Sequence, residues 1–158
     1  MQRALAPVVI ALFVAIPSLA WAAPASLTGA VQTPLVLDEA TLKSIPAVSL
    51  DISFKTVAGT ETGHYTGALV WDLLAKAVPV NGPGKNAALK HTLLITGADG
   101  YAVSVAFGEM DPNFAAKQVL LAYDGAGGKA SFAHLRLLVP GDLHGGRSVS
   151  DVTSIEVK

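Results

Sequence analysis

The stretch TLLITGADGYAVSVA, Thr92–Ala106, combines three patterns that together predict a β-hairpin. It opens with the apolar run Leu93–Ile95 and closes with residues that alternate between larger and smaller side chains. Between the two runs, Gly97 and Gly100 can adopt the positive φ of a tight turn, and Asp99 can hydrogen-bond to the nearby backbone. We therefore expect a structural hairpin in the core of the domain.

The composition is that of a globular chain that is rich in apolar residues. It has 158 residues, of which 51% are hydrophobic and 15% charged, enough for one domain with a substantial core. The formal net charge is −1 and no basic stripe is present, so nucleic acid is not an expected partner. The sequence has no cysteine, which excludes disulfides, thiolate metal sites, iron–sulfur clusters and cysteine nucleophiles.

The N-terminus has the pattern of a secretory signal peptide. Arg3 precedes the apolar run Ala4–Ile16, and small residues occupy positions −3 and −1 before a cleavage site after Ala22. The alternative is an uncleaved membrane anchor, for which this run is short. We expect residues 1–22 to be the signal peptide and residues 23–158 to form a single periplasmic or secreted domain, without a membrane span after cleavage.

Beyond the hairpin, the sequence predicts short strands and a few short helices. Alternation of apolar and polar residues is clearest in Ala47–Thr56, where every second residue from Val48 to Phe54 is apolar. Further elements are expected as strands at Gln118–Tyr123, Leu135–Pro140 and Val152–Val157, helices at Glu39–Ser44 (capped by Asp38) and Ala68–Val78, a polar turn at Ala58–Gly63, and irregular structure at Phe107–Pro112. This order predicts an α+β fold with a β-rich mixed sheet.

Four segments, in this order, resemble the molybdopterin-binding domain of the sulfite oxidase family. They are YTGALVWDLL at Tyr65–Leu74, TGADGYAVSV at Thr96–Val105, LRLLVPGD at Leu135–Asp142, and GGRSVSDVTSIEV at Gly145–Val157. Together they cover most of the chain after about residue 27. The resemblance implies the sulfite oxidase-type fold and a molybdopterin-dependent oxidoreductase activity. Function depends on the site and not on the fold alone, so the two expectations are separate.

The resemblance also implies a metal ligand that this chain lacks. In the family, molybdenum takes two sulfurs from the pterin and one from a protein cysteine, a soft ligand suited to this metal. The corresponding position would lie near Leu50–Val57, which contains no thiol. Family members are generally exported folded with a twin-arginine signal, whereas Arg3 stands alone here. Both departures favour a protein without redox chemistry.

The resemblance assigns two arginines to the phosphate of the pterin. Arg136 matches the arginine of a His-Gly-x-Pro-x-Arg pattern, and Arg147 matches the first residue of an Arg/Lys-x-Val-Lys-Trp pattern. Ser148, next to Arg147, joins them as a cofactor-binding candidate. Other positions depart from these patterns, with Ser131, Phe132 and His134 in place of His, Gly and Pro, and Ser150 and Asp151 in place of Lys and Trp. Alternatively, the arginines are surface charges or structural partners of Asp142 or Asp151.

Other candidate sites are weaker. The histidines His64, His91, His134 and His144 show no metal-binding spacing, so no metal site is assigned, although His134 and His144 could converge with Asp142. No nucleophile elbow surrounds Ser104 or Ser148, so a hydrolase is unsupported and no catalytic residue is identified.

The sequence leaves three hypotheses for function. The first is an exported, non-catalytic accessory module that binds a small anionic ligand or a periplasmic partner protein. The second is a molybdopterin-dependent oxidoreductase that holds its cofactor through Arg136 and Arg147 without a protein thiolate. The third is an exported metal-binding protein. The second requires a basic pocket that contains both arginines, whereas the first expects them to diverge.

Overall fold

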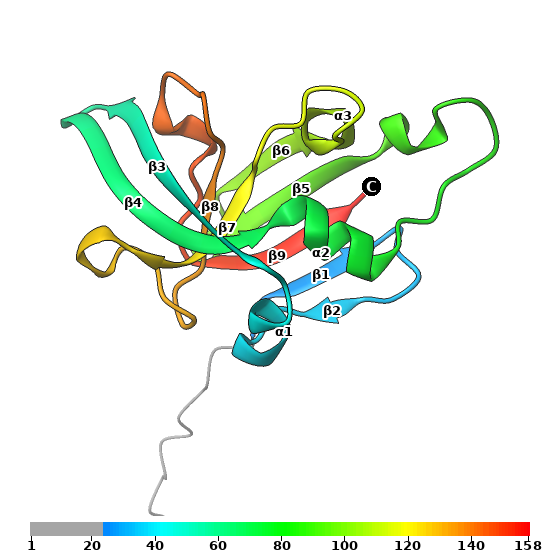
Figure 1. Cartoon of the computed structure of the whole chain (residues 1–158), viewed down its shortest axis with the longest axis horizontal. Helices are drawn as coiled ribbons and strands as arrows, with labels where there is room; N and C mark the ends of the chain where they lie inside the picture. The colour runs from blue at the N-terminus through cyan, green and yellow to red at the C-terminus, as the bar shows by residue number, and fades with distance from the viewer. Residues whose placement is uncertain (1–23) are drawn as a thin grey trace, which may run out of the picture.

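Two β-sheets contribute to a shared apolar core in the computed structural model, which describes residues 24–158 (Figure 1). The predicted signal peptide lies outside these residues. The five-stranded sheet has the order β2-β1-β9-β5-β6, with β1 Ser26–Gly29, β2 Leu35–Val36, β5 Thr92–Gly97, β6 Ala102–Ala106 and β9 Val152–Val157. The four-stranded sheet has the order β3-β4-β7-β8, with β3 Ala47–Thr56, β4 Gly59–Leu69, β7 Leu120–Gly125 and β8 Arg136–Leu138. Strands β1 and β9 pair in parallel.

The helices are short, as predicted. They are α1 Glu39–Lys43, α2 Val70–Ala77 and α3 Phe107–Met110, with 3₁₀ turns at Ala87–Lys90, Ala126–Gly128 and Gly145–Arg147. The Asp38 side chain accepts a hydrogen bond from the backbone N–H of Thr41 at 2.8 Å and so caps α1, while Leu42 is fully buried. The predicted α+β fold with a β-rich mixed sheet and few helices is confirmed.

The hairpin predicted at Thr92–Ala106 is formed by β5 and β6. Asp99 accepts a hydrogen bond from the backbone N–H of Tyr101 at 2.9 Å, and Gly100 has a φ of 83°. The role expected for Gly97 is wrong, because this residue does not have a positive φ. A Cβ atom there would lie 2.8 Å from the carbonyl oxygen of Ser150, so close packing against the start of β9 requires the glycine.

Strand β3 has the predicted bounds, but the polar turn expected at Ala58–Gly63 is wrong. Strand β4 begins at Gly59 and pairs with β3 along its whole length, leaving Val57 and Ala58 as a two-residue turn. Pairing with β3 provides hydrogen-bond partners for the backbone N–H and C=O groups of this polar segment. This effect depends on a neighbouring strand, so the composition of the segment does not reveal it. The helix expected from Ala68 starts two residues later, at Val70, and the segment expected to be irregular includes α3.

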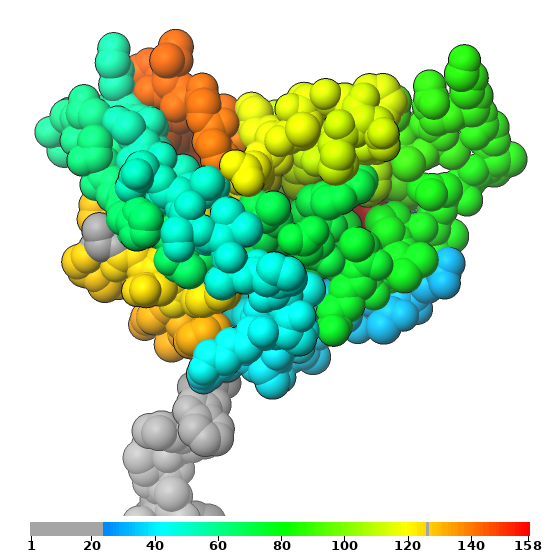
Figure 2. Space-filling model, viewed as in Figure 1, coloured from blue at the N-terminus to red at the C-terminus, as the bar shows by residue number. Residues whose placement is uncertain are grey.

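The four-stranded sheet has an apolar cluster on each face. One face contributes Ala68, Leu121 and Leu137 to the main core that it shares with the five-stranded sheet. The other face carries a smaller cluster inside the curl of the β3–β4 hairpin, formed by Ile52, Phe54, Tyr65, Leu120, Ala122, Ala130 and Leu138. The outer end of this hairpin lies beside residues 143–144, joined by a hydrogen bond from the N–H of Lys55 to the carbonyl of Leu143 at 2.9 Å (Figure 2).

Close packing between β4 and β7 makes Gly67 a sensitive position. A Cβ atom at Gly67 would lie 2.3 Å from the carbonyl oxygen of Leu121, and backbone cannot yield as a flexible side chain can. We predict that Gly67→Ala lowers the free energy of unfolding by about 1–3 kcal/mol, measured by urea denaturation. Gly82→Ala is the matched control, because a Cβ atom at Gly82 has nothing within 4 Å. Equal stability of the two variants would contradict this account of β4–β7 packing.

Candidate functional site

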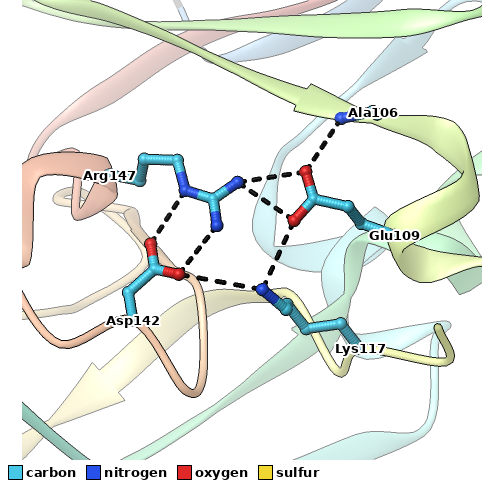
Figure 3. A network of polar contacts seen from close by, with 5 residues as sticks. All are labelled: Ala106, Glu109, Lys117, Asp142 and Arg147. Carbon is cyan, nitrogen blue, oxygen red and sulfur yellow. Dashed lines mark hydrogen bonds and ion pairs between the residues drawn. The ribbon is translucent and has the colours of Figure 1, made fainter.

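Arg147 lies at the centre of a cluster of four charged side chains, the Arg147 cluster, formed with Glu109, Lys117 and Asp142 (Figure 3). Its guanidinium donates two hydrogen bonds to the Asp142 carboxylate, at 2.8 and 2.7 Å, and two to the Glu109 carboxylate, at 3.0 and 3.1 Å. Lys117 reaches Glu109 at 3.3 Å and Asp142 at 3.7 Å. Two positive and two negative groups thus neutralise one another.

The electrostatics of this cluster favour the charged forms of Glu109, Asp142 and Arg147. Hydrogen bonds from Arg147 lower the pKa of Asp142, although partial burial opposes the shift. For Glu109, burial raises the pKa, but the hydrogen bonds from Arg147, the Ala106 N–H and Lys117 outweigh it and leave the pKa lowered. The Asp142 carboxylate in turn raises the pKa of Arg147. The cluster fixes α3 to the segment that follows β8.

Arg136 is held by a second group of residues, the Arg136 cluster, formed with Glu61, Tyr65 and Ser148. Its side chain is only 10% exposed and forms an ion pair with the Glu61 carboxylate at 2.9 Å. The guanidinium also donates to the hydroxyl oxygens of Tyr65 at 3.1 Å and Ser148 at 3.0 Å. The carbon of the guanidinium lies 5.6 Å from the centre of the Tyr65 ring, so the arginine packs against the smaller apolar cluster.

Glu61 is the counter-ion that makes the burial of Arg136 tolerable. Burial raises the pKa of Glu61, but hydrogen bonds from Lys129 and Arg136 outweigh it and leave the pKa lowered. Burial raises the pKa of Tyr65, whose hydroxyl donates to the same carboxylate at 3.1 Å. A buried charge without such a partner is strongly destabilising.

The two arginines expected to share a phosphate site therefore lie in separate clusters that have no residue in common. The alternative pairing of Arg147 with Asp142 is what the structure contains, whereas Arg136 pairs with Glu61. The sequence analysis missed Glu61, which falls in the segment expected to be a turn, and Glu109, which falls in the segment expected to be irregular. The hydroxyl of Ser148 accepts a hydrogen bond from the Nε–H group of Arg136.

These residues do not fit a molybdopterin site of the kind that the resemblance implies. The guanidinium groups already bind other side chains of this protein, carboxylates at Arg147 and one carboxylate and two hydroxyl groups at Arg136. Glu109 and Asp142 would also repel an anion at Arg147. A thiolate ligand for molybdenum is absent from the sequence.

The alternative in which His134 and His144 converge with Asp142 on a metal, to which the sequence assigned no site, is not what the structure contains. The Nδ1 atom of His134 lies 2.6 Å from the Asp151 carboxylate, while Asp142 binds Arg147. His144 lies beside Lys55 at the outer end of β3. Within residues 24–158, no group of three or more His, Asp or Glu side chains is arranged to hold a metal ion.

A pocket of about 830 Å³ has neither arginine in its lining. We call it the Phe132 pocket. It is lined by Pro24, Ala25, Leu37, Asp38, Glu39, Ala98, Phe132, Ala133, His134, Leu135, Asp151, Val152 and Thr153. A smaller pocket of about 500 Å³ lies at the outer end of the β3–β4 hairpin, beside His144. Neither pocket is lined by Arg136 or Arg147.

Comparison with known proteins supports the fold. No family model matches the chain, and no curated protein matches it. Among solved structures it is similar to the sulfane dehydrogenase SoxCD from Paracoccus pantotrophus, with a TM-score of 0.63 and 22% sequence identity, over 84% of this chain. The chain spans 37% of the length of that protein. The likeness confirms a sulfite oxidase-like α+β fold, as the sequence resemblance implied.

No helix in residues 24–158 has both the length and the apolar character needed to span a membrane.

The Arg147 cluster makes stability depend on pH in a defined direction. The pKa values of Glu109 and Asp142 are lowered from their ordinary 4.5 and 3.8, so their stabilising effect is complete above these values and is lost as the pH falls through the lowered ones. We predict that Arg147→Met costs about 1–3 kcal/mol at neutral pH. The difference from the wild type should shrink in strongly acidic solution, as the pH falls through the lowered pKa values and both carboxyl groups become protonated.

Urea denaturation at both pH values measures this effect. The control is Lys158→Met, which removes a positive charge from an exposed pair with Glu156 and should cost less than about 1 kcal/mol. If Arg147→Met lowers the free energy of unfolding by the same amount at both pH values, the cluster has no electrostatic role. The cost would then come from packing of the side chain.

Proposed function

We propose that this chain is an exported, non-redox binding module built on a sulfite oxidase-like fold. The observation that carries the proposal is that carboxylates of the same chain engage both arginines that would otherwise hold the pterin phosphate. The missing cysteine points in the same direction. The fold is thus retained while the residues that would serve the cofactor stabilise the protein itself.

Binding of an external anion by Arg147 would cost a large amount of free energy. The guanidinium would have to leave the bidentate pair with Asp142 and the contacts with Glu109, and these two carboxylates would then lie next to both the bound anion and each other. For Arg136 the obstacle is burial, because its ion pair with Glu61 lies inside the curl of the β3–β4 hairpin. Neither arginine is poised to bind an external phosphate.

A molybdopterin-dependent oxidoreductase is the second candidate. It is favoured by the likeness of the fold to a sulfane dehydrogenase, of which this chain spans 37% of the length. It would need a metal ligand other than a protein thiolate, and it would need to rearrange both arginine clusters. The first candidate requires neither change, and we therefore prefer it.

Metal and pterin analysis separates the two candidates. The chain, with its own N-terminal segment, is produced in a bacterium that synthesises the molybdenum cofactor and is purified under mild conditions. We expect molybdenum and pterin far below one per chain by elemental analysis and by fluorescence of oxidised extracts. A molybdenum enzyme of the host, purified in parallel, is the control. Near-stoichiometric molybdenum with pterin in the folded protein would overturn the proposal.

Export is tested separately. The pattern of Met1–Ala22 predicts that the chain is found in the periplasmic fraction and that its N-terminus is Ala23, as N-terminal sequencing would establish. Replacing Val14 in the apolar run with Asp should retain the full-length precursor in the cytoplasm. A wild-type protein recovered from the cytoplasm with residues 1–22 still attached would contradict this part of the proposal.

A further inference from the structure

The Phe132 pocket is built from five segments that are far apart in the sequence. They are the chain before β1, the junction of β2 and α1, the β5–β6 turn, the tight turn before β8, and the start of β9. Its volume of about 830 Å³ falls in the range of pockets that enclose small organic ligands. No residue of the Arg147 cluster or the Arg136 cluster lines this pocket, so the ion pairs of those clusters leave it open.

The inner surface of this pocket is apolar and has one aromatic wall. Leu37, Leu135 and Val152 are buried and form part of the lining. The ring of Phe132 stacks on that of Tyr123, with ring centres 4.5 Å apart and an angle of 12° between the planes, which fixes its orientation. A ligand with an apolar or aromatic body would therefore meet a pre-oriented surface.

The polar groups of the lining are acidic. Asp38, Glu39 and Asp151 contribute carboxylates and His134 an imidazole, and the Nζ atom of Lys43 lies 5.3 Å from the centre of the Phe132 ring. Glu39 is paired with Lys43 and Asp151 with the Nδ1 atom of His134, so three carboxylates face one lysine and one imidazole. The backbone N–H of Thr41 lowers the pKa of Asp38, which keeps this carboxylate ionised. The charge of the pocket is complementary to a cation.

Backbone hydrogen bonds hold the pocket walls together. The carbonyl of Asp151 accepts from the N–H of Ala98 at 2.9 Å, and the N–H of Val152 donates to the carbonyl of Leu135 at 2.9 Å. Asp151 itself has a φ of 49°, in the left-handed region that most residues avoid but Asp and Asn tolerate. Its carboxylate meets His134 at 2.6 Å. The lining is thus preformed, which reduces the entropic cost of binding.

The lining includes three of the five positions where the sequence departs from the patterns of the resemblance. Phe132, His134 and Asp151 stand where the two patterns have Gly, Pro and Trp, and all three line this pocket. They supply the aromatic wall, the imidazole and one of the carboxylates of the lining.

We propose that the Phe132 pocket binds a small organic ammonium ion with an apolar or aromatic body. The ammonium group would donate a hydrogen bond to the Asp151 carboxylate, with Asp38 adding negative charge to the same lining, and the body would lie against Phe132 and the apolar floor. This inference rests on the proposed function of a non-redox binding module and names its ligand class. The sequence analysis considered a small anionic ligand for a binding module. The Phe132 pocket is lined by carboxylates and favours a cation instead.

Calorimetric titration of the mature protein tests the charge preference. The probe is phenylethylammonium at about pH 8. Phenylethanol and phenylacetate present the same ring with a neutral and an anionic end. We expect the ammonium ion to bind at least about tenfold more tightly than either, which corresponds to the loss of one charge-assisted contact. Equal affinity of the three compounds would overturn the proposal.

Variants assign the binding to this pocket. Asp151→Asn keeps the size of the side chain and its tolerance of positive φ, and should weaken binding of the probe at least about tenfold. Asp124→Asn removes the same charge from an exposed site outside the pocket and should leave binding within about twofold. Phe132→Leu should weaken binding of all three compounds. Wild-type affinity in both Asp151→Asn and Phe132→Leu would overturn the assignment.

The outcomes also separate this proposal from the proposed function. A protein free of molybdenum that binds none of the three compounds would disprove the ligand class and leave the non-redox module standing. A lysine-containing peptide that binds when the small probe does not would assign the pocket to a protein partner and overturn the proposal. Stoichiometric molybdenum would disprove the non-redox module whatever the titration gives.

Discussion

The burial of the Arg136 charge is the constraint on which much of this structure depends. A guanidinium that is only 10% exposed requires a counter-ion, and Glu61 on β4 supplies it at 2.9 Å. This pair joins β8 to the long hairpin, and the bond from Arg136 to Ser148 adds the segment that leads into β9. Two strands of the four-stranded sheet and the segment before β9 therefore meet at one buried ion pair, which lies beside the small apolar cluster.

Pairing of arginines with carboxylates also explains why this chain has the fold that the resemblance implies without the cofactor site that it implies. In a site for a phosphate, arginines must keep donors free and face a cavity. Here the chain supplies carboxylates to both Arg136 and Arg147, so the donors are used inside the protein. The likeness to a sulfane dehydrogenase at 22% identity is a likeness of backbone architecture. The same backbone architecture is compatible with different side-chain pairs, which is why the fold alone does not carry the activity.

The cavity that remains has a different chemistry. Apolar residues at the start of β9 and before β8 form its floor, and acidic groups from distant segments form its polar part. The carboxylates of Asp38 and Asp151 reach it from a helix cap and from a residue with a positive φ. Each of these positions has a local structural reason, and together they create a surface that attracts a cation.

The sequence by itself determined the local elements and one chemical limit. The hairpin at Thr92–Ala106, the alternating strand Ala47–Thr56 and the cap at Asp38 follow from short-range patterns, since side-chain periodicity and turn chemistry act within a few residues. The absence of cysteine excluded a thiolate ligand. Only the tertiary structure decided that Arg136 pairs with Glu61 and that five separate segments enclose a pocket, because such contacts depend on how strands are registered and packed across the chain, which no local spacing records.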